Sequence, residues 1–165
     1  RPEHDNLRAL ILETGGMRGS VVRSLGTARF PKLEYLELWL GTDEYGGDTT
    51  VDDLRPILLG EAFPNLRYLG LRNSDIVDSL AQPLVDGLVV QRLETLDLSL
   101  GTLSDEGGFA LLALKSPSLK RLNLHHNYLG TEMARKLQEL PFSVDTSNPS
   151  AMESYDNYRF VAVGE

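Results

Sequence analysis

The sequence of 165 residues contains no cysteine, so neither a disulfide framework nor a thiolate metal site is available to it. It has no apolar run approaching the roughly 18 residues of a membrane span, and no signal-peptide pattern at its start. Basic residues are few, 16 against 24 acidic ones. The resulting acidic field repels phosphate, so we expect neither nucleic acid nor a membrane as a partner. Together these absences favour the cytoplasm.

Leucine, in contrast, recurs in a nine-residue phrase that has it at the first, fourth and sixth positions. The phrase occurs five times, as LRALILETG, LEYLELWLG, LRYLGLRNS, LETLDLSLG and LKRLNLHHN. The copies begin at Leu7, Leu33, Leu66, Leu93 and Leu119. Spacings of 26, 33, 27 and 26 residues lie in the range typical of solenoids, and the longest includes an insertion at Thr42–Thr50.

The second half of each copy has the spacing of an amphipathic helix. Apolar or small residues fall fourteen and eighteen positions after the first leucine of each copy, once the insertion in the second copy is left out of the count. These pairs are Val21/Leu25, Leu54/Leu58, Leu80/Leu84, Gly107/Leu111 and Met133/Leu137. A further apolar residue follows in four copies, at Ala28, Leu88, Leu114 and Leu140. Ser104, followed by two acids, is a typical helix start.

Each copy therefore predicts one strand, a loop, one helix and a return loop. A single copy cannot bury both its strand leucines and its helix stripe, so neighbouring copies must stack and share a core. The fold class predicted is α/β, with a parallel sheet on one side and helices on the other.

This pattern resembles leucine-rich repeat proteins of the longer, ribonuclease-inhibitor-like class, over about Leu7 to Asp145. The resemblance implies a solenoid shaped as a right-handed horseshoe arc, with a parallel concave sheet and outer helices. The family places Asn or Cys at the ninth position of the phrase. Here that position holds Gly15, Gly41, Ser74, Gly101 and Asn127, so only Asn127 conforms and the other turns must satisfy their backbone groups in another way.

A closer resemblance is to a bacterial family of leucine-rich repeat proteins that has no established activity. It extends over LEYLELWLGTDEYGGD, LRYLGLRNS, LDLSLGTLSDEG and the terminal YRFVAVGE. Similar bacterial repeats are found attached to WGR-type domains. That resemblance implies an alternative function, an accessory C-terminal repeat domain that docks within a larger bacterial enzyme or regulator.

The repeat domain is expected to span residues 1–145, with about five full repeats and a short sixth strand at Phe142–Asp145. Residues 146–165 are predicted to be a C-terminal capping tail, in which YRFVAV alternates like an edge strand and Tyr158, Phe160 and Val161 cover the core. A partner-binding tail is the alternative. At the other end RPEHDN has nothing apolar, so further N-terminal repeats or a domain of the same chain should cover Leu7 to Leu12.

The residues between the leucines must face away from the core, because side chains alternate along a strand. They form three columns across the five strands: Ala9, Tyr35, Tyr68, Thr95 and Arg121; Ile11, Glu37, Gly70, Asp97 and Asn123; Glu13, Trp39, Arg72, Ser99 and His125. Aromatic residues and arginine are enriched at interface hot spots. We therefore predict a partner-binding surface made of Tyr35, Glu37, Trp39, Tyr68, Arg72, Asp97, Arg121 and His125.

Two other interpretations of this surface remain open. In one, the aromatic residues are simply packed against one another and the rim loop. In the other, the acidic insertion at residues 42–50 is either a solvated loop, or a lid over the patch or a contact for a basic partner. The partner itself is expected to be another protein or a peptide.

The sequence contains no nucleophile motif, phosphate loop or metal signature. His125 and His126 are adjacent on a strand and point to opposite sides, so they cannot chelate together. Glu37 and Asp97 share a column but are separated by the third strand, about 10 Å apart at the usual strand spacing. We expect a non-enzymatic protein with no catalytic, cofactor or metal residues. Catalysis would require a deep pocket with convergent ionisable groups beneath Gly46-Gly47.

Overall fold

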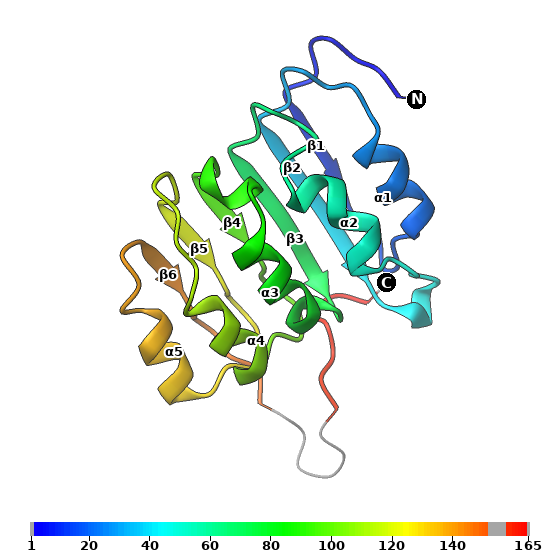
Figure 1. Cartoon of the computed structure of the whole chain (residues 1–165). Helices are drawn as coiled ribbons and strands as arrows, with labels where there is room; N and C mark the ends of the chain where they lie inside the picture. The colour runs from blue at the N-terminus through cyan, green and yellow to red at the C-terminus, as the bar shows by residue number, and fades with distance from the viewer. Residues whose placement is uncertain (1, 152–157, 165) are drawn as a thin grey trace.

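The computed structural model describes residues 2–151 and 158–164, which form a two-layered α/β protein (Figure 1). Within this part of the chain six parallel strands pair in chain order, from β1 at one edge of the sheet to β6 at the other. The strands are β1 Ala9–Leu12, β2 Tyr35–Gly41, β3 Tyr68–Ser74, β4 Thr95–Asp97, β5 Arg121–Asn123 and β6 Ser143–Asp145.

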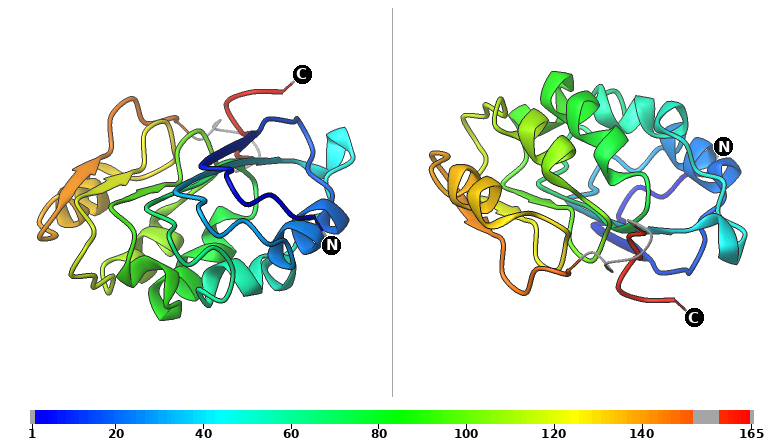
Figure 2. Two further views of the ribbon diagram at one scale, coloured as in Figure 1. Left: turned by 90° about the horizontal axis from the view of Figure 1, so that it is seen from above. Right: turned by 90° about the horizontal axis from the view of Figure 1, so that it is seen from below.

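One helix follows each of the first five strands, and we call each strand with its helix a unit. The helices are α1 Gly19–Gly26, α2 Val51–Leu58, α3 Val77–Asp86, α4 Asp105–Leu111 and α5 Thr131–Leu137, with short 3-10 turns at Asp43–Tyr45 and Val89–Gln91. Figure 2 shows that the helices cover one face of the sheet. The opposite face is called the open face below. None of the helices in the described ranges has the length and apolar character needed to cross a membrane.

The leucine register predicted from the phrase is confirmed. Leu36, Leu69, Leu96 and Leu122 are paired in sequence across the strands and are fully buried beneath the helices. The intervening columns are aligned as predicted, with Tyr35 beside Tyr68 and Trp39 beside Arg72. Apolar burial between sheet and helices is thus the dominant contribution to folding in every unit.

The predicted helix stripe is correct at most positions and wrong at two. Val21 is exposed and Val22 is buried in its place, because α1 presents residues three apart, Val22 and Leu25, to the core. Leu88 is also exposed, because α3 ends at Asp86 and the chain becomes extended at Gly87. The adjacent Val89 and Val90 fill the core instead. Ser104 caps α4 as predicted, accepting a hydrogen bond from the Glu106 amide.

The turns after the strands satisfy one another's backbone groups. Asn127 is buried and uses its whole amide: Oδ1 accepts from the Leu103 N–H, and Nδ2 donates to two carbonyls. Where the ninth position of the phrase holds glycine or serine, neighbouring turns hydrogen-bond to each other directly. The Thr42 N–H donates to the Gly15 carbonyl at 2.9 Å, and the Thr102 N–H donates to the Ser74 carbonyl at 3.1 Å.

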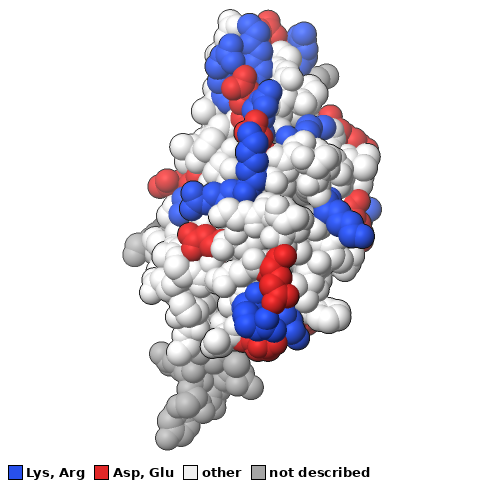
Figure 3. Space-filling view, turned by 90° about the vertical axis from the view of Figure 1, so that its left-hand side faces the viewer, with Lys and Arg blue, Asp and Glu red and all other residues white. Residues whose placement is uncertain are grey.

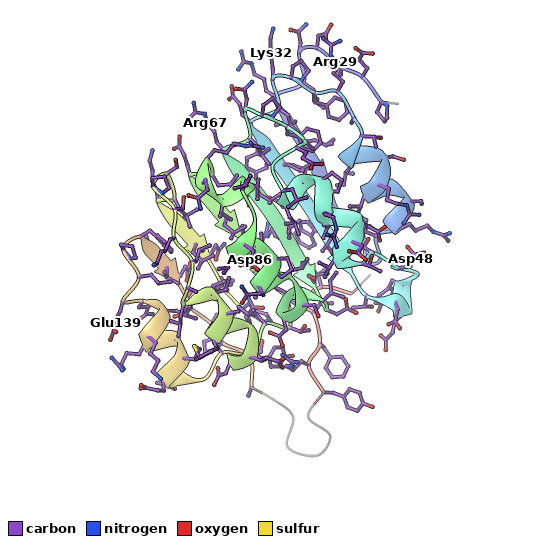
Figure 4. All side chains as sticks on the ribbon, in the orientation of Figure 1. Arg29, Lys32, Asp48, Arg67, Asp86 and Glu139 are labelled. Carbon is purple, nitrogen blue, oxygen red and sulfur yellow. The ribbon has the colours of Figure 1, made fainter. Side chains whose placement is uncertain are left out.

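Charged side chains alternate in sign where the strands begin. One position in each unit holds, in order, Arg8, Glu34, Arg67, Glu94 and Lys120. The N–H of each of the last four donates to the carbonyl of the corresponding residue in the previous unit. Ion pairs join Arg8 to Glu34 at 2.8 Å and both Arg67 and Lys120 to Glu94 at 2.7 Å. We call this row the charge ladder. Figure 3 faces this side of the molecule and shows red and blue side chains interspersed along it, and Figure 4 labels Arg67 there.

The tail differs from the predicted cap. Residues 158–164 form no strand, and Tyr158 and Phe160 are more than half exposed. The segment lies along the ends of β4 and β3, where its backbone hydrogen-bonds to the Leu100 carbonyl after β4 and to the Asn73 side chain of β3. Residues 152–157 of the predicted tail lie outside the described part of the chain, and the division at residue 145 stays a prediction.

Candidate functional site

The predicted partner-binding residues of β2, β3 and β4 form one connected group on the open face. Six of them interact directly and are called the open-face cluster: Tyr35, Glu37, Trp39, Tyr68, Arg72 and Asp97. Strand alternation points all six away from the leucine core, and the parallel register sets them in neighbouring rows.

Glu37 is the centre of the cluster and is only 4% exposed. Its Oε2 accepts hydrogen bonds from the hydroxyls of Tyr35 at 2.6 Å and Tyr68 at 3.1 Å. Its Oε1 accepts from Nε1 of Trp39 at 2.8 Å and from Nη1 of Arg72 at 2.9 Å. Three donors, together with the Tyr68 proton that Glu37 shares with Asp97, compensate the removal of this carboxylate from water.

Asp97 is the second buried carboxylate, 5% exposed, and Tyr68 connects it to Glu37. The Tyr68 hydroxyl lies 2.9 Å from Oδ2 of Asp97, which also accepts from Asn123 at 3.0 Å. The third strand does separate the two acids, as predicted, but its residue in that row is Gly70. A Cβ there would lie 3.1 Å from the Tyr68 ring and 3.1 Å from Cγ of Glu37, so glycine leaves the space that the ring occupies.

The aromatic and cationic side chains lie over these carboxylates and are half-buried. The Tyr35 and Tyr68 rings stack with centroids 3.9 Å apart and planes 8° from parallel. The guanidinium of Arg72 lies 5.0 Å above the Trp39 ring, a cation–π contact, and its Nε donates to Oγ of Ser99 at 3.0 Å. These contacts hold the four large side chains in place on the open face.

Glu37 and Arg72 of the cluster keep their charges. Burial raises the pKa of Glu37, but hydrogen bonds from Trp39, Tyr35 and Arg72 outweigh it and hold that pKa below its ordinary value. Burial lowers the pKa of Arg72, but the charges of Asp97 and Glu37 outweigh that effect and raise it. Burial, Tyr35 and the Asp97 carboxylate together raise the pKa of Tyr68 far above the usual range, so it stays a protonated donor.

Arg121 and His125 lie outside the cluster. Arg121 is exposed and lies 3.6 Å from the carboxylate of Asp145 on β6, and His125 Nδ1 is 2.9 Å from Oγ of Ser147. Arg121 is paired with Thr95 as predicted, whereas β5 ends at Asn123 and His125 lies beyond the paired strand. The partners of both residues come from the last strand and the loop after it. Gly70, Ser99 and Asn123 complete the cluster and were not predicted as site residues. The sequence signal for Gly70 was its position between Glu37 and Asp97 in one column.

The insertion after β2 does not lie over the cluster. The Asp48 N–H donates to the Met17 carbonyl at 3.1 Å, and its Oδ1 accepts from the Gly19 N–H at 2.7 Å, so the loop is fixed against the segment before α1. Figure 4 labels Asp48 at that corner. A hollow of about 310 Å³ does lie beside Gly47, but the ionisable residues that line it are three aspartates, Asp43, Asp48 and Asp75, with no histidine, lysine or tyrosine among them.

The chemistry offered by the cluster is recognition through aromatic faces and one guanidinium. The oxygens of the two carboxylates accept hydrogen bonds from groups of the same chain. The ring surfaces and the outer side of Arg72 are therefore the parts that can contact another molecule. Among the described residues no group of three His, Asp or Glu side chains is placed to hold a metal ion.

Comparison with known proteins finds a likeness among solved structures. No protein-family model matches the sequence, and no curated protein matches it. Among solved structures, the chain is similar to the crystal structure of a protein from Bacteroides fragilis, a structural genomics target, with a TM-score of 0.86 and 32% sequence identity. The match covers 98% of this chain and 45% of that one, so the chain spans less than half the length of its bacterial neighbour.

Proposed function

We propose that this chain is a leucine-rich repeat solenoid of the cytoplasm that works without catalysis and binds a protein or peptide on its open face. The observation that carries the proposal is the pre-formed open-face cluster. Tyr35, Trp39, Tyr68 and Arg72 are half-buried but immobilised by two buried carboxylates. Fixing such side chains in advance removes about 0.5–1.5 kcal/mol of ordering cost per residue on binding.

The size and shape of this surface favour a macromolecular partner. Strands lie about 4.8 Å apart, so three adjacent strands present a row of contacts roughly 10 Å wide, extended further by β5 and β6. The surface has aromatic faces at its centre and charged groups such as Arg121 at its edge, the distribution usual in protein interfaces. An extended segment or a helix of another protein fits these dimensions.

The test is capture of a partner from extract of the native cell by three proteins: the parent, Trp39→Ala and Phe109→Ala. Phe109 is an aromatic residue on α4, 73% exposed, and provides a matched loss of surface on the helical side. A protein captured by the parent and by Phe109→Ala, but lost with Trp39→Ala, supports the proposal. Equal capture by all three variants, each shown to be folded by circular dichroism, contradicts it.

A second candidate is an accessory domain that docks within a larger protein. It is favoured by the exposed apolar side chains of the first unit, Ile11 on β1 at 52% and Val21 on α1 at 42%, and by the greater length of the Bacteroides fragilis neighbour. Hydrogen exchange in the protein of native length discriminates the two. Strong protection of the Ala9–Leu12 amides from a packed neighbour supports docking, whereas fast exchange there excludes it.

A further inference from the structure

The C-terminal residues 158–164 are bound along the carboxyl ends of the strands, on the rim of the molecule. In Figure 1 this segment, in red, passes the arrowhead of β3. It runs opposite to the order of the units, from the loop after β5 toward the end of β3. Its partners come from β3 and from the segments that follow β3, β4 and β5, and we call them the rim groove: Asn73, Asp78, Leu100, Thr102 and Tyr128.

Most contacts of the rim groove hold the main chain of the tail. The Tyr128 hydroxyl accepts from the Phe160 N–H at 2.9 Å and donates to the Phe160 carbonyl at 3.1 Å. The buried Asn73 side chain repeats this pattern at Val163: Oδ1 accepts from the N–H at 2.9 Å, and Nδ2 donates to the carbonyl at 2.8 Å. Two polar side chains thus bind both the N–H and the C=O of one residue each.

The rim groove binds a side chain of the tail through hydrogen bonds at one position only. Nη1 of Arg159 donates to Oδ2 of Asp78 at 2.7 Å and also to the Thr102 carbonyl, and its side chain is largely buried there. Phe160 and Val163, in contrast, are 55% and 43% exposed, so the groove makes little use of their identity.

From these contacts we infer that the rim groove is a binding site for an extended peptide with a single arginine, and that the chain's own tail occupies it as an exchangeable ligand. The Ala162 N–H also donates to the Leu100 carbonyl, so amides are required at positions 160, 162 and 163 and proline is excluded at all three. Other side chains are tolerated. The partner class is therefore an extended segment with arginine at the place of Arg159. The rim groove shares no residue with the open-face cluster, so this inference is independent of the proposed function.

Release of the tail can be followed in the full chain because Trp39 is its only tryptophan. Trp39 lines a hollow of about 200 Å³ together with Val163 and Gly164. In Arg159→Gln, acrylamide should quench Trp39 fluorescence more strongly than in the parent. Amide exchange at positions 160, 162 and 163 should accelerate at least about tenfold, because a locally weakened segment opens more often. Arg135→Gln, which alters an exposed arginine on α5, is the matched control and should change neither readout.

Exchange with a second molecule is tested by adding a synthetic peptide of residues 158–164. The peptide should bind the Arg159→Gln protein at least about tenfold more tightly than the parent, whose own tail competes at high effective concentration. A peptide with glutamine in place of its arginine should bind at least about tenfold more weakly. Unchanged amide exchange in Arg159→Gln, or equal binding of the two peptides, overturns the inference.

Discussion

Replacing Tyr68 by phenylalanine removes one hydroxyl from the middle of the open-face cluster and leaves the ring in place. That hydroxyl lies 2.9 Å from Asp97 and 3.1 Å from Glu37. It has one proton, so it donates to one carboxylate at a time. The stacking on Tyr35 involves the ring faces, which phenylalanine retains. Tyr68→Phe therefore isolates the contribution of the hydroxyl.

The expected loss is one hydrogen bond to a charged acceptor, about 1.5–3 kcal/mol of unfolding free energy. This loss is smaller than the roughly 3–5 kcal/mol expected when a buried charge is left without its partner. Glu37 keeps the Trp39 and Arg72 donors, and Asp97 keeps Asn123 and the Ser99 N–H. For a domain of this size the melting temperature should fall by about 3–12 °C.

Urea unfolding followed by circular dichroism measures the change. Asp97→Asn and the double variant close a double-mutant cycle, in which we expect Tyr68 and Asp97 to be coupled by about 1 kcal/mol or more. Tyr158→Phe, at an exposed tyrosine, is the control and should stay within about 0.5 kcal/mol of the parent. An unchanged urea midpoint for Tyr68→Phe, or a coupling of zero, would refute the assignment of this hydroxyl as the link between the carboxylates.

Two further predictions concern Glu37 and Asn127. Because the pKa of Glu37 is lower in the folded chain than in the unfolded chain, its charged form adds stability above the unfolded pKa of about 4.3, and this contribution is lost as the pH falls through the folded pKa. The difference in unfolding free energy between the parent and Glu37→Gln should thus be largest near neutral pH and shrink toward about pH 3; urea titrations showing a constant difference contradict this. Asn127→Ala removes three buried hydrogen bonds and should cost about 2–4 kcal/mol, against under about 0.5 kcal/mol for the exposed Asn6→Ala; equal costs in urea unfolding would show that the Asn127 amide is not required.

The strand register could be predicted because it depends on a local rule. A side chain that alternates with buried leucines must face the other way, and this places Tyr35, Trp39, Tyr68 and Arg72 on one face before any coordinates are known. Helix phase was less predictable. α4 has a Ser104 cap that marks its beginning, whereas the residue before α1, Arg18, makes no side-chain cap, and there the predicted stripe is shifted by one residue.

The internal connections of the site could not be predicted from columns alone. Column order gave the separation of Glu37 and Asp97, but the link through Tyr68 depends on a ring lying over Gly70, which is a matter of side-chain rotamers. The tail was missed for another reason. Its binding relies on main-chain groups and on side chains such as Asn73, far away in sequence, whereas the alternation of YRFVAV predicted an edge strand that residues 158–164 do not form.

The charge ladder has a consequence for how such a chain gains or loses length. Deleting the unit that carries Glu94 would set Arg67 directly beside Lys120, and duplicating it would place two glutamates in adjacent rows. Removing or adding two consecutive units preserves the alternation of sign. Each surface pair is worth only about 0–1 kcal/mol, yet like charges in adjacent rows oppose the stacking on which every unit depends. Insertions and deletions in related chains are therefore expected to favour even numbers of units, a parity imposed by electrostatics and not by the leucine core.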